Sequence, residues 1–127
     1  MPKILVVDDL RESADSLALL FDALGHETMT SYDGQQAVEA AQSFEPDIVF
    51  LDINMPILDG YGAARSLRQV MVDTPPVLVA LTAVSGPDAK RRADAAGFDF
   101  YFTKPADFNV LITIVDDLSR RMESRPG

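Results

Sequence analysis

The chain has 127 residues, 47% of them hydrophobic and 24% charged, which are the proportions of a single globular domain with one core. Its 20 acidic and 11 basic side chains give a net charge of −9, which disfavours direct binding to nucleic acid or to an anionic membrane surface. The absence of cysteine excludes disulfides and thiolate chemistry and fits a reducing compartment, so we expect a cytoplasmic protein. Only four apolar residues stand together before the two acids at the start of the sequence, which is too few for a signal peptide or a membrane span.

The first half of the chain alternates between strand-like and helical patterns. Residues 4–7 are continuously apolar, which is typical of a strand buried on both faces. Apolar residues recur every three or four positions over residues 12–24, which predicts an amphipathic helix. A second strand at 27–32 contains polar residues, so we expect it at a sheet edge. A second helix follows over 34–43, with Asp33 as its N-terminal cap.

The alternation continues in the second half. Residues 48–51 and 77–81 predict two further buried strands, and residues 58–70 predict the helix between them. The fourth helix is expected over residues 87–97, from a proline in its first turn to a glycine at its end.

The last strand and helix complete the predicted domain. Residues 98–102 predict a second edge strand, and the fifth helix begins near Phe108 with one apolar stripe. We expect a single domain over residues 1–122, followed by a polar tail over 123–127.

Five strands alternating with five helices predict a doubly wound α/β fold, in which a parallel sheet is built through right-handed crossovers and covered by helices on two faces. Placing the two interrupted strands outermost gives the strand order 2-1-3-4-5. In this order the sheet changes direction between the first and third strands, and ligands bind there, outside the carboxyl ends of the strands.

Polar side chains stand at that edge, where four of the strands end: Asp8 and Asp9, Asp52, Thr82 and Lys104. Two unit charges about 4 Å apart repel by roughly 4 kcal/mol at an effective dielectric constant near 20, so three clustered carboxylates would take up protons or bind a cation. Oxygen ligands of this kind favour Mg²⁺, which uses few carboxylates and a phosphate oxygen.

A carboxylate beside Mg²⁺ can attack phosphorus and form an acyl phosphate. We therefore interpret Asp52 as a nucleophile at the rim of a buried strand. Lys104 and the Thr82 hydroxyl would balance the charge of the phosphoryl oxygens.

Four motifs resemble the receiver domain of two-component response regulators: VVDD at 6–9, LDINMPILDG at 51–60, LTA at 81–83 and TKP at 103–105. The resemblance extends over essentially the whole chain and implies a flavodoxin-like fold. It implies a phosphorelay signalling protein that is phosphorylated on an aspartate with Mg²⁺ as cofactor.

The resemblance also implies the roles of individual residues around the metal. Asp52 would be the phosphoacceptor, and Mg²⁺ would be bound by Asp9, by Asp52 and by the backbone carbonyl of Asn54. Asp8 would hold the metal through water.

Further roles follow for the phosphoryl group and the switch. Thr82 and Lys104 would contact the phosphoryl group, assisted by the backbone amides of Asn54 and Ala83. Tyr101 would be the switch aromatic, turning inward when Thr82 moves toward the phosphoryl group. The family often has a cis peptide bond at the position of Lys104 and Pro105.

Three other positions carry expectations. Leu10 follows the acid pair where many members of the family have a polar residue, but the metal carboxylates stay in place. Apolar Val84, two residues after Thr82, predicts a long-lived acyl phosphate because it orients no attacking water. His26, the only histidine, is expected in an exposed turn and is a poor phosphodonor. The phosphoryl group would therefore come from a sensor histidine kinase, a histidine phosphotransfer protein or a small acyl phosphate.

We interpret the chain as a signalling switch rather than a turnover enzyme. A downstream protein would bind the fourth helix, fifth strand and fifth helix, because the fourth helix has alanines and no large apolar residue and should be weakly docked. One alternative is an aspartyl-phosphate phosphatase, although such enzymes carry a DxD motif after the first strand. Another is the receiver module of a hybrid sensor histidine kinase. A flavin carrier of the same fold is disfavoured, because Asp8 and Asp9 would face the cofactor phosphate.

Overall fold

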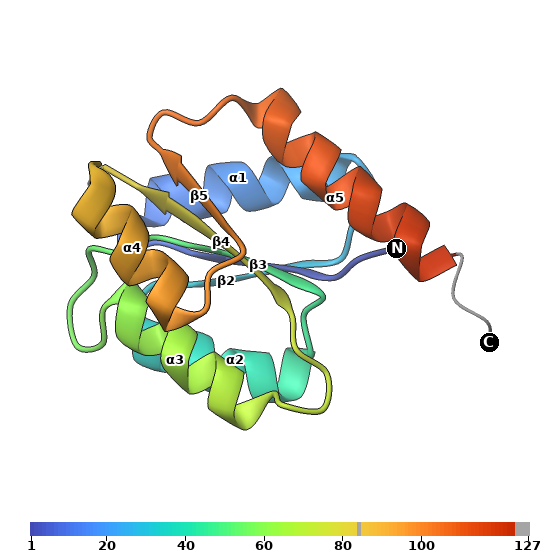
Figure 1. Cartoon of the computed structure of the whole chain (residues 1–127). Coiled ribbons are helices and arrows are strands. Elements are labelled where there is room, and N and C mark those ends of the chain that lie inside the picture. The colour runs from blue at the N-terminus through green and yellow to red at the C-terminus, as the bar shows by residue number, and fades with distance from the viewer. Residues whose placement is uncertain (84, 124–127) are drawn as a thin grey trace.

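The computed structural model describes residues 1–83 and 85–123, and this part of the chain contains five strands and five helices in strict alternation (Figure 1). The strands are β1 (Ile4–Val7), β2 (Thr28–Ser31), β3 (Ile48–Leu51), β4 (Val77–Thr82) and β5 (Phe100–Thr103). The helices are α1 (Arg11–Ala23), α2 (Gly34–Phe44), α3 (Gly60–Val70), α4 (Pro87–Ala96) and α5 (Phe108–Glu123). All four strand pairs are parallel and the order is β2-β1-β3-β4-β5, which confirms the predicted doubly wound sheet.

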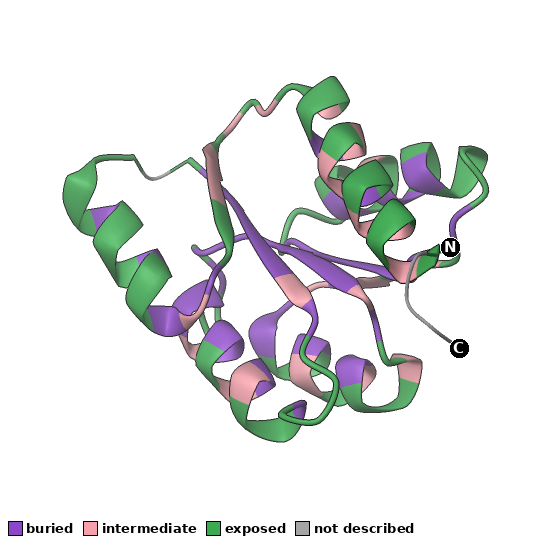
Figure 2. Ribbon diagram, turned by 45° about the vertical axis from the view of Figure 1, so that its right-hand side comes forward, coloured by how far each residue is buried: buried purple, intermediate pink, exposed green. Residues whose placement is uncertain are grey.

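The sheet separates two cores. Helices α1 and α5 cover one face, and α2, α3 and α4 cover the other (Figure 1). Successive side chains of a strand point to opposite faces, so Leu5 and Val7 join the core under α2 and α3 while Ile4 and Val6 join the core under α1 and α5. Both faces of β1 and β3 are therefore buried, as their continuous apolar sequences predict (Figure 2).

Helix α3 begins two residues later than the sequence predicts. Asp59 is its N-cap and accepts a hydrogen bond from the Gly62 amide at 2.9 Å. Before the helix, the Leu58 amide donates to the Pro56 carbonyl at 2.8 Å, which closes a tight turn in place of a first helical turn. The predicted cap of α2 is confirmed, since Asp33 accepts from the Gln36 amide at 2.8 Å.

The prediction of an exposed His26 is wrong. His26 is only 7% exposed, because the turn after α1 folds beneath the N-terminal segment. The Nδ1 atom lies 3.2 Å from the Pro2 carbonyl oxygen, and the ring packs edge-on against Phe21.

Helix α4 presents alanines to the core, as predicted, but polar contacts from α3 also hold it. Its buried residues are Ala89, Ala93 and Ala96. The Tyr61 hydroxyl donates to the Ala89 carbonyl at 3.3 Å, and the Arg92 guanidinium lies 4.2 Å above the Tyr61 ring.

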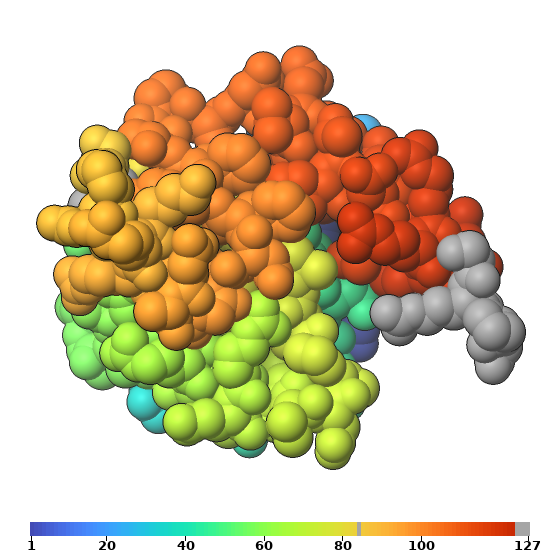
Figure 3. All heavy atoms as spheres, viewed as in Figure 1, coloured from blue at the N-terminus to red at the C-terminus, as the bar shows by residue number. Residues whose placement is uncertain are grey.

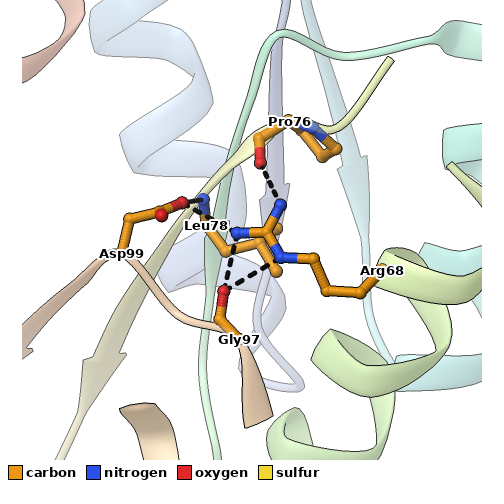
Figure 4. Close-up of polar contacts among 5 residues, drawn as sticks. All are labelled: Arg68, Pro76, Leu78, Gly97 and Asp99. Atoms are coloured by element: carbon orange, nitrogen blue, oxygen red, sulfur yellow. Dashed lines mark hydrogen bonds and ion pairs between the residues drawn. The ribbon is translucent and has the colours of Figure 1, made fainter. Parts of the chain in front are cut away.

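The C-terminal end of α4 is tied to the sheet by Arg68 of α3 (Figure 4). Its guanidinium donates to the Gly97 carbonyl at 2.6 and 3.0 Å and to the Pro76 carbonyl at 2.7 Å. It also contacts the Asp99 carboxylate at 2.8 Å, and the same carboxylate oxygen accepts from the Leu78 amide. One side chain therefore joins α3, the start of β4 and the segment between α4 and β5.

Two expectations concern residues outside the described part of the chain, namely the role of Val84 and the polar tail at residues 124–127. Glu123, predicted to be the first residue of that tail, is the last residue of α5. Over residues 1–83 and 85–123, none of the helices combines the length and the apolar character that a bilayer crossing needs.

Candidate functional site

The predicted polar residues meet at the carboxyl edge of the sheet. Asp8 follows β1, Asp52 follows β3, Thr82 ends β4 and Lys104 follows β5. The parallel register explains the meeting, because Val7 pairs with Leu51 and Thr82 pairs with Thr103. The Asp52 amide donates to the Val7 carbonyl at 2.9 Å, which holds the starts of the two acidic loops side by side.

Lys104 forms ion pairs with two carboxylates of the acidic cluster. Its ammonium nitrogen lies 2.7 Å from a carboxylate oxygen of Asp8 and 3.6 Å from one of Asp52. The other Asp8 oxygen accepts from the Leu10 amide at 3.0 Å. The Lys104 to Pro105 peptide bond is cis, as the family resemblance implies.

The Asp52 carboxyl is buried, and burial raises its pKa from the ordinary value of 3.8 to about 6. The positive charge of Lys104 opposes this rise, the negative charge of Asp8 adds to it, and the amides of Ile53 and Asn54 lower the pKa by hydrogen bonding. Desolvation outweighs these stabilising contacts, so the charged carboxylate is held in a site that does not fully neutralise it.

Burial alone would lower the pKa of the Lys104 ammonium, but its hydrogen bond to Asp8 and the charges of Asp52 and Asp8 outweigh burial and raise the pKa above its ordinary value. Lys104 therefore stays positively charged at neutral pH. An ammonium group in this position can stabilise negative charge that develops beside Asp52.

The carboxylates fit a hard divalent cation. Each of Asp8, Asp9 and Asp52 offers an oxygen, and these three atoms lie within 4.8 Å of one another. Asp8 and Asp52 are buried while Asp9 is exposed, so the cluster opens to solvent on one side. An all-oxygen set of this size, with room for water, has the chemistry of a Mg²⁺ site.

The loop between β3 and α3 contains a feature that the sequence analysis missed. Ile57 has a φ of 72°, and the hydrogen bond from Leu58 to Pro56 spans it, which is the pattern of a classic γ-turn. A β-branched residue rarely adopts this conformation, so the turn is strained. Ile57 is 82% exposed, and its own side chain is too little packed to hold the turn closed.

The remaining predicted residues are not members of the acidic cluster. Asn54 is exposed two residues after Asp52, Thr82 is fully buried, and Ala83 directly follows it on the surface. Tyr101 is half-buried against the core under α2, α3 and α4 rather than within the cluster. Burial and the neighbouring Tyr61 raise the pKa of its phenol.

Residues 4–116 match the family model of the response regulator receiver domain. The chain belongs to this family. Receiver domains are phosphoacceptor signalling modules, and the acidic cluster at the carboxyl edge of this receiver domain agrees with that role.

Curated relatives extend well beyond the region that they share with this receiver domain. It is 37% identical over 123 residues to the transcriptional regulatory protein PrrA of Mycobacterium tuberculosis, covering 97% of the chain and 52% of the relative. It is 28% identical to the cell cycle transcriptional regulator CtrA of Caulobacter vibrioides, covering 94% and 51%. The chain thus spans about half the length of the curated relatives it matches, and the expected absence of nucleic-acid contacts stays a prediction.

Solved structures share the fold closely. The receiver domain of the Francisella response regulator 1452 is 30% identical, with a TM-score of 0.85 and coverage of 96% of this chain and 99% of that one. A two-component response regulator from Clostridium difficile is 25% identical, with a TM-score of 0.88 and coverage of 98% and 100%.

Proposed function

We propose that this receiver domain accepts a phosphoryl group on Asp52 from a phosphohistidine of a sensor histidine kinase or histidine phosphotransfer protein, or from a small acyl phosphate. A carboxylate oxygen of Asp52 attacks phosphorus and forms an O–P bond. The P–N bond to the donor imidazole breaks, and the imidazole leaves with the bonding electron pair and takes a proton from solvent. With acetyl phosphate, the P–O bond breaks and acetate leaves.

The contact of one ammonium group with two carboxylates carries this proposal. Lys104 approaches both Asp8 and Asp52, while Asp8, Asp9 and Asp52 share the oxygen cluster. Mg²⁺ bound there would supply positive charge toward the incoming phosphoryl group, with Asp9, Asp52 and the Asn54 carbonyl as direct ligands and Asp8 acting through water.

Four further groups complete the proposed site. Lys104 would contact a phosphoryl oxygen, and the Thr82 hydroxyl with the Asn54 and Ala83 amides would bind the others. These groups position and neutralise the phosphoryl group without supplying a water for turnover, so we propose a switch rather than a turnover phosphatase.

Intact-protein mass spectrometry after incubation with acetyl phosphate and MgCl₂ tests the proposal. The wild type should gain the mass of one phosphoryl group, and Asp52→Asn should gain none. EDTA should prevent the gain in the wild type. Labelling of Asp52→Asn at the wild-type rate would contradict the assignment of the acceptor.

We further propose that α4, β5 and α5 form the surface that a downstream protein reads. These elements are adjacent on one face of the molecule (gold through red in Figure 3). Small buried side chains on α4 and the half-buried Tyr101 support this assignment, because elements with little apolar burial are the ones a ligand can move.

Amide hydrogen exchange with and without beryllofluoride, a stable substitute for the phosphoryl group, tests the proposed surface. Exchange in α4 and β5 should change, while exchange in α2, which lies outside the proposed surface, should change little. Unchanged exchange across α4 and β5 at saturating beryllofluoride would refute the assignment.

A further inference from the structure

The loop that begins with Asp52 returns to its own start. The Gly60 amide donates to the Ile53 carbonyl at 2.8 Å, and a Cβ on Gly60 would lie 2.4 Å from the Asp52 carbonyl oxygen. The backbone at Asp52 and the first residue of α3 are therefore in direct contact. A displacement of the loop between them would reach the phosphoacceptor.

The middle of this loop needs support from elsewhere. Ile57, the central residue of the strained γ-turn, is 82% exposed. Neither its backbone conformation nor local apolar packing therefore stabilises the turn. Such a conformation persists only where the surrounding structure fixes it. The residue after Ile57, Leu58, is where another part of the chain makes contact.

That contact is made by Gly34, the first residue of α2. A Cβ on Gly34 would lie 2.1 Å from the Leu58 carbonyl oxygen and 2.9 Å from its carbonyl carbon, so only glycine permits this approach of two backbones. Gly34 is itself held in place, because Asp33 caps the helix through the Gln36 amide and the Asp33 carbonyl accepts from Ala37. The capped end of α2 is a rigid surface against which the turn rests.

We propose that Gly34 is a positioning residue for the metal site, although it lies on a different element and touches none of the proposed ligands. Because Gly34 has no side chain, its backbone packs directly against the Leu58 backbone and holds Leu58 in place. Leu58 in turn keeps the γ-turn closed, and the closed turn fixes the position of the backbone from Asp52 to Asn54. This inference rests on the proposed function, because the backbone it positions includes Asp52 and the proposed carbonyl ligand of Asn54.

Two glycine substitutions that both place a methyl group against Leu58 test this role. Gly34→Ala forces a new methyl group against the Leu58 backbone, whereas Gly62→Ala places one 2.6 Å from the Leu58 Cδ1, the movable end of the side chain. Isothermal titration with MgCl₂ should show binding weakened by about 10-fold or more in Gly34→Ala, the range known for residues that support metal ligands. Gly62→Ala should stay within about twofold of the wild type, because a side-chain end can rotate away.

A second pair avoids the steric clash in case Gly34→Ala does not fold. Asp33→Ala removes the cap that holds Gly34, while Asp33→Asn removes the same charge but keeps an effective capping side chain. Mg²⁺ binding should weaken several-fold in Asp33→Ala and return to near the wild-type value in Asp33→Asn. Circular dichroism and thermal midpoints without Mg²⁺ verify that each variant is folded during the titration.

The outcomes separate this inference from the proposed function. If the wild type binds Mg²⁺ and is labelled by acetyl phosphate, but Gly34→Ala and Gly62→Ala bind Mg²⁺ equally well, the positioning role of Gly34 is refuted and the phosphoacceptor function stands. Equal weakening by Asp33→Ala and Asp33→Asn would also refute it, because charge rather than capping would then be responsible. A wild type that neither binds Mg²⁺ nor is labelled would refute both.

Discussion

Replacing the Asp52 carboxylate by an amide should stabilise the metal-free protein. Burial raises the pKa of Asp52 from 3.8 to about 6, and each pKa unit corresponds to 1.36 kcal/mol, so the charged carboxylate costs about 3 kcal/mol of unfolding free energy above pH 6. The side chain is only 10% exposed, and this pKa already includes the attraction of Lys104. Asn has nearly the same shape and avoids the cost.

The pH dependence gives the sign of the effect. Because the folded-state pKa lies above the unfolded-state value, the folded protein binds more protons between pH 3.8 and about 6. This group's contribution to stability is therefore greatest below pH 3.8, falls as the pH rises through that interval, and stays low above it. The advantage of Asp52→Asn should be about 3 kcal/mol near pH 8 and below about 1 kcal/mol near pH 4.

Urea unfolding in EDTA, followed by circular dichroism at both pH values, measures this difference. Asp22→Asn, an exposed substitution on α1, is the matched control and should change stability little. Saturating Mg²⁺ should narrow the gap at pH 8, because it stabilises the wild type more than the variant. A variant no more stable than the wild type at pH 8, or an advantage that persists unchanged at pH 4, would refute the role assigned to carboxylate burial.

Three further predictions concern the metal site, Arg68 and the γ-turn. Mg²⁺ affinity should fall by about tenfold per pH unit below pH 6, because protons compete with the metal for Asp52. Lys104→Met should raise the pH at which this fall begins, because the ammonium lowers the pKa of Asp52. Calorimetric titration with MgCl₂ over a pH series measures both effects. Arg68→Ala should lower the unfolding free energy by about 2 kcal/mol, because its charged hydrogen bonds to backbone carbonyls are lost, whereas Arg65→Ala on the exposed side of α3 should have little effect in the same urea assay. Ile57→Asn should raise the thermal midpoint through a gain of about 1 kcal/mol, since Asn adopts positive φ more readily; an unchanged or lower midpoint would argue against strain at the γ-turn.

The architecture and the acidic cluster could be predicted because they depend on local patterns. Continuous apolar runs located β1 and β3 to the residue, and parallel pairing then required Asp8 and Asp52 to stand at one edge. The order of the strands followed from the two segments with polar interruptions. In these cases composition within a few residues was enough.

The missed features depend on contacts between distant segments. Nothing near His26 indicates that residues 1–3 will cover it, and nothing near Ile57 indicates that Gly34 will support the turn from 23 positions earlier. The two Asp-Gly pairs at 33–34 and 59–60 were a usable signal, because each places a glycine at the first residue of a helix where another backbone passes closely. The sequence does not show which backbone that is.

The anchoring of α4 by Arg68 determines how the helix can be displaced. Its C-terminal end is fixed by two charged bonds to the Gly97 carbonyl, whereas near its N-terminal end the Tyr61 hydroxyl makes a longer, neutral bond of 3.3 Å to the Ala89 carbonyl, and the N-cap Gly86 has a φ of 114° and provides no side-chain cap. A rigid helix that is held more firmly at one end rotates about that end instead of sliding. Since ten helical residues extend about 15 Å, a tilt of about 10° would move the less firmly held N-terminal end by about 2 to 3 Å and leave the C-terminal end in place. The surface near Pro87 would then change shape, while the surface near Gly97 would be the same before and after the tilt.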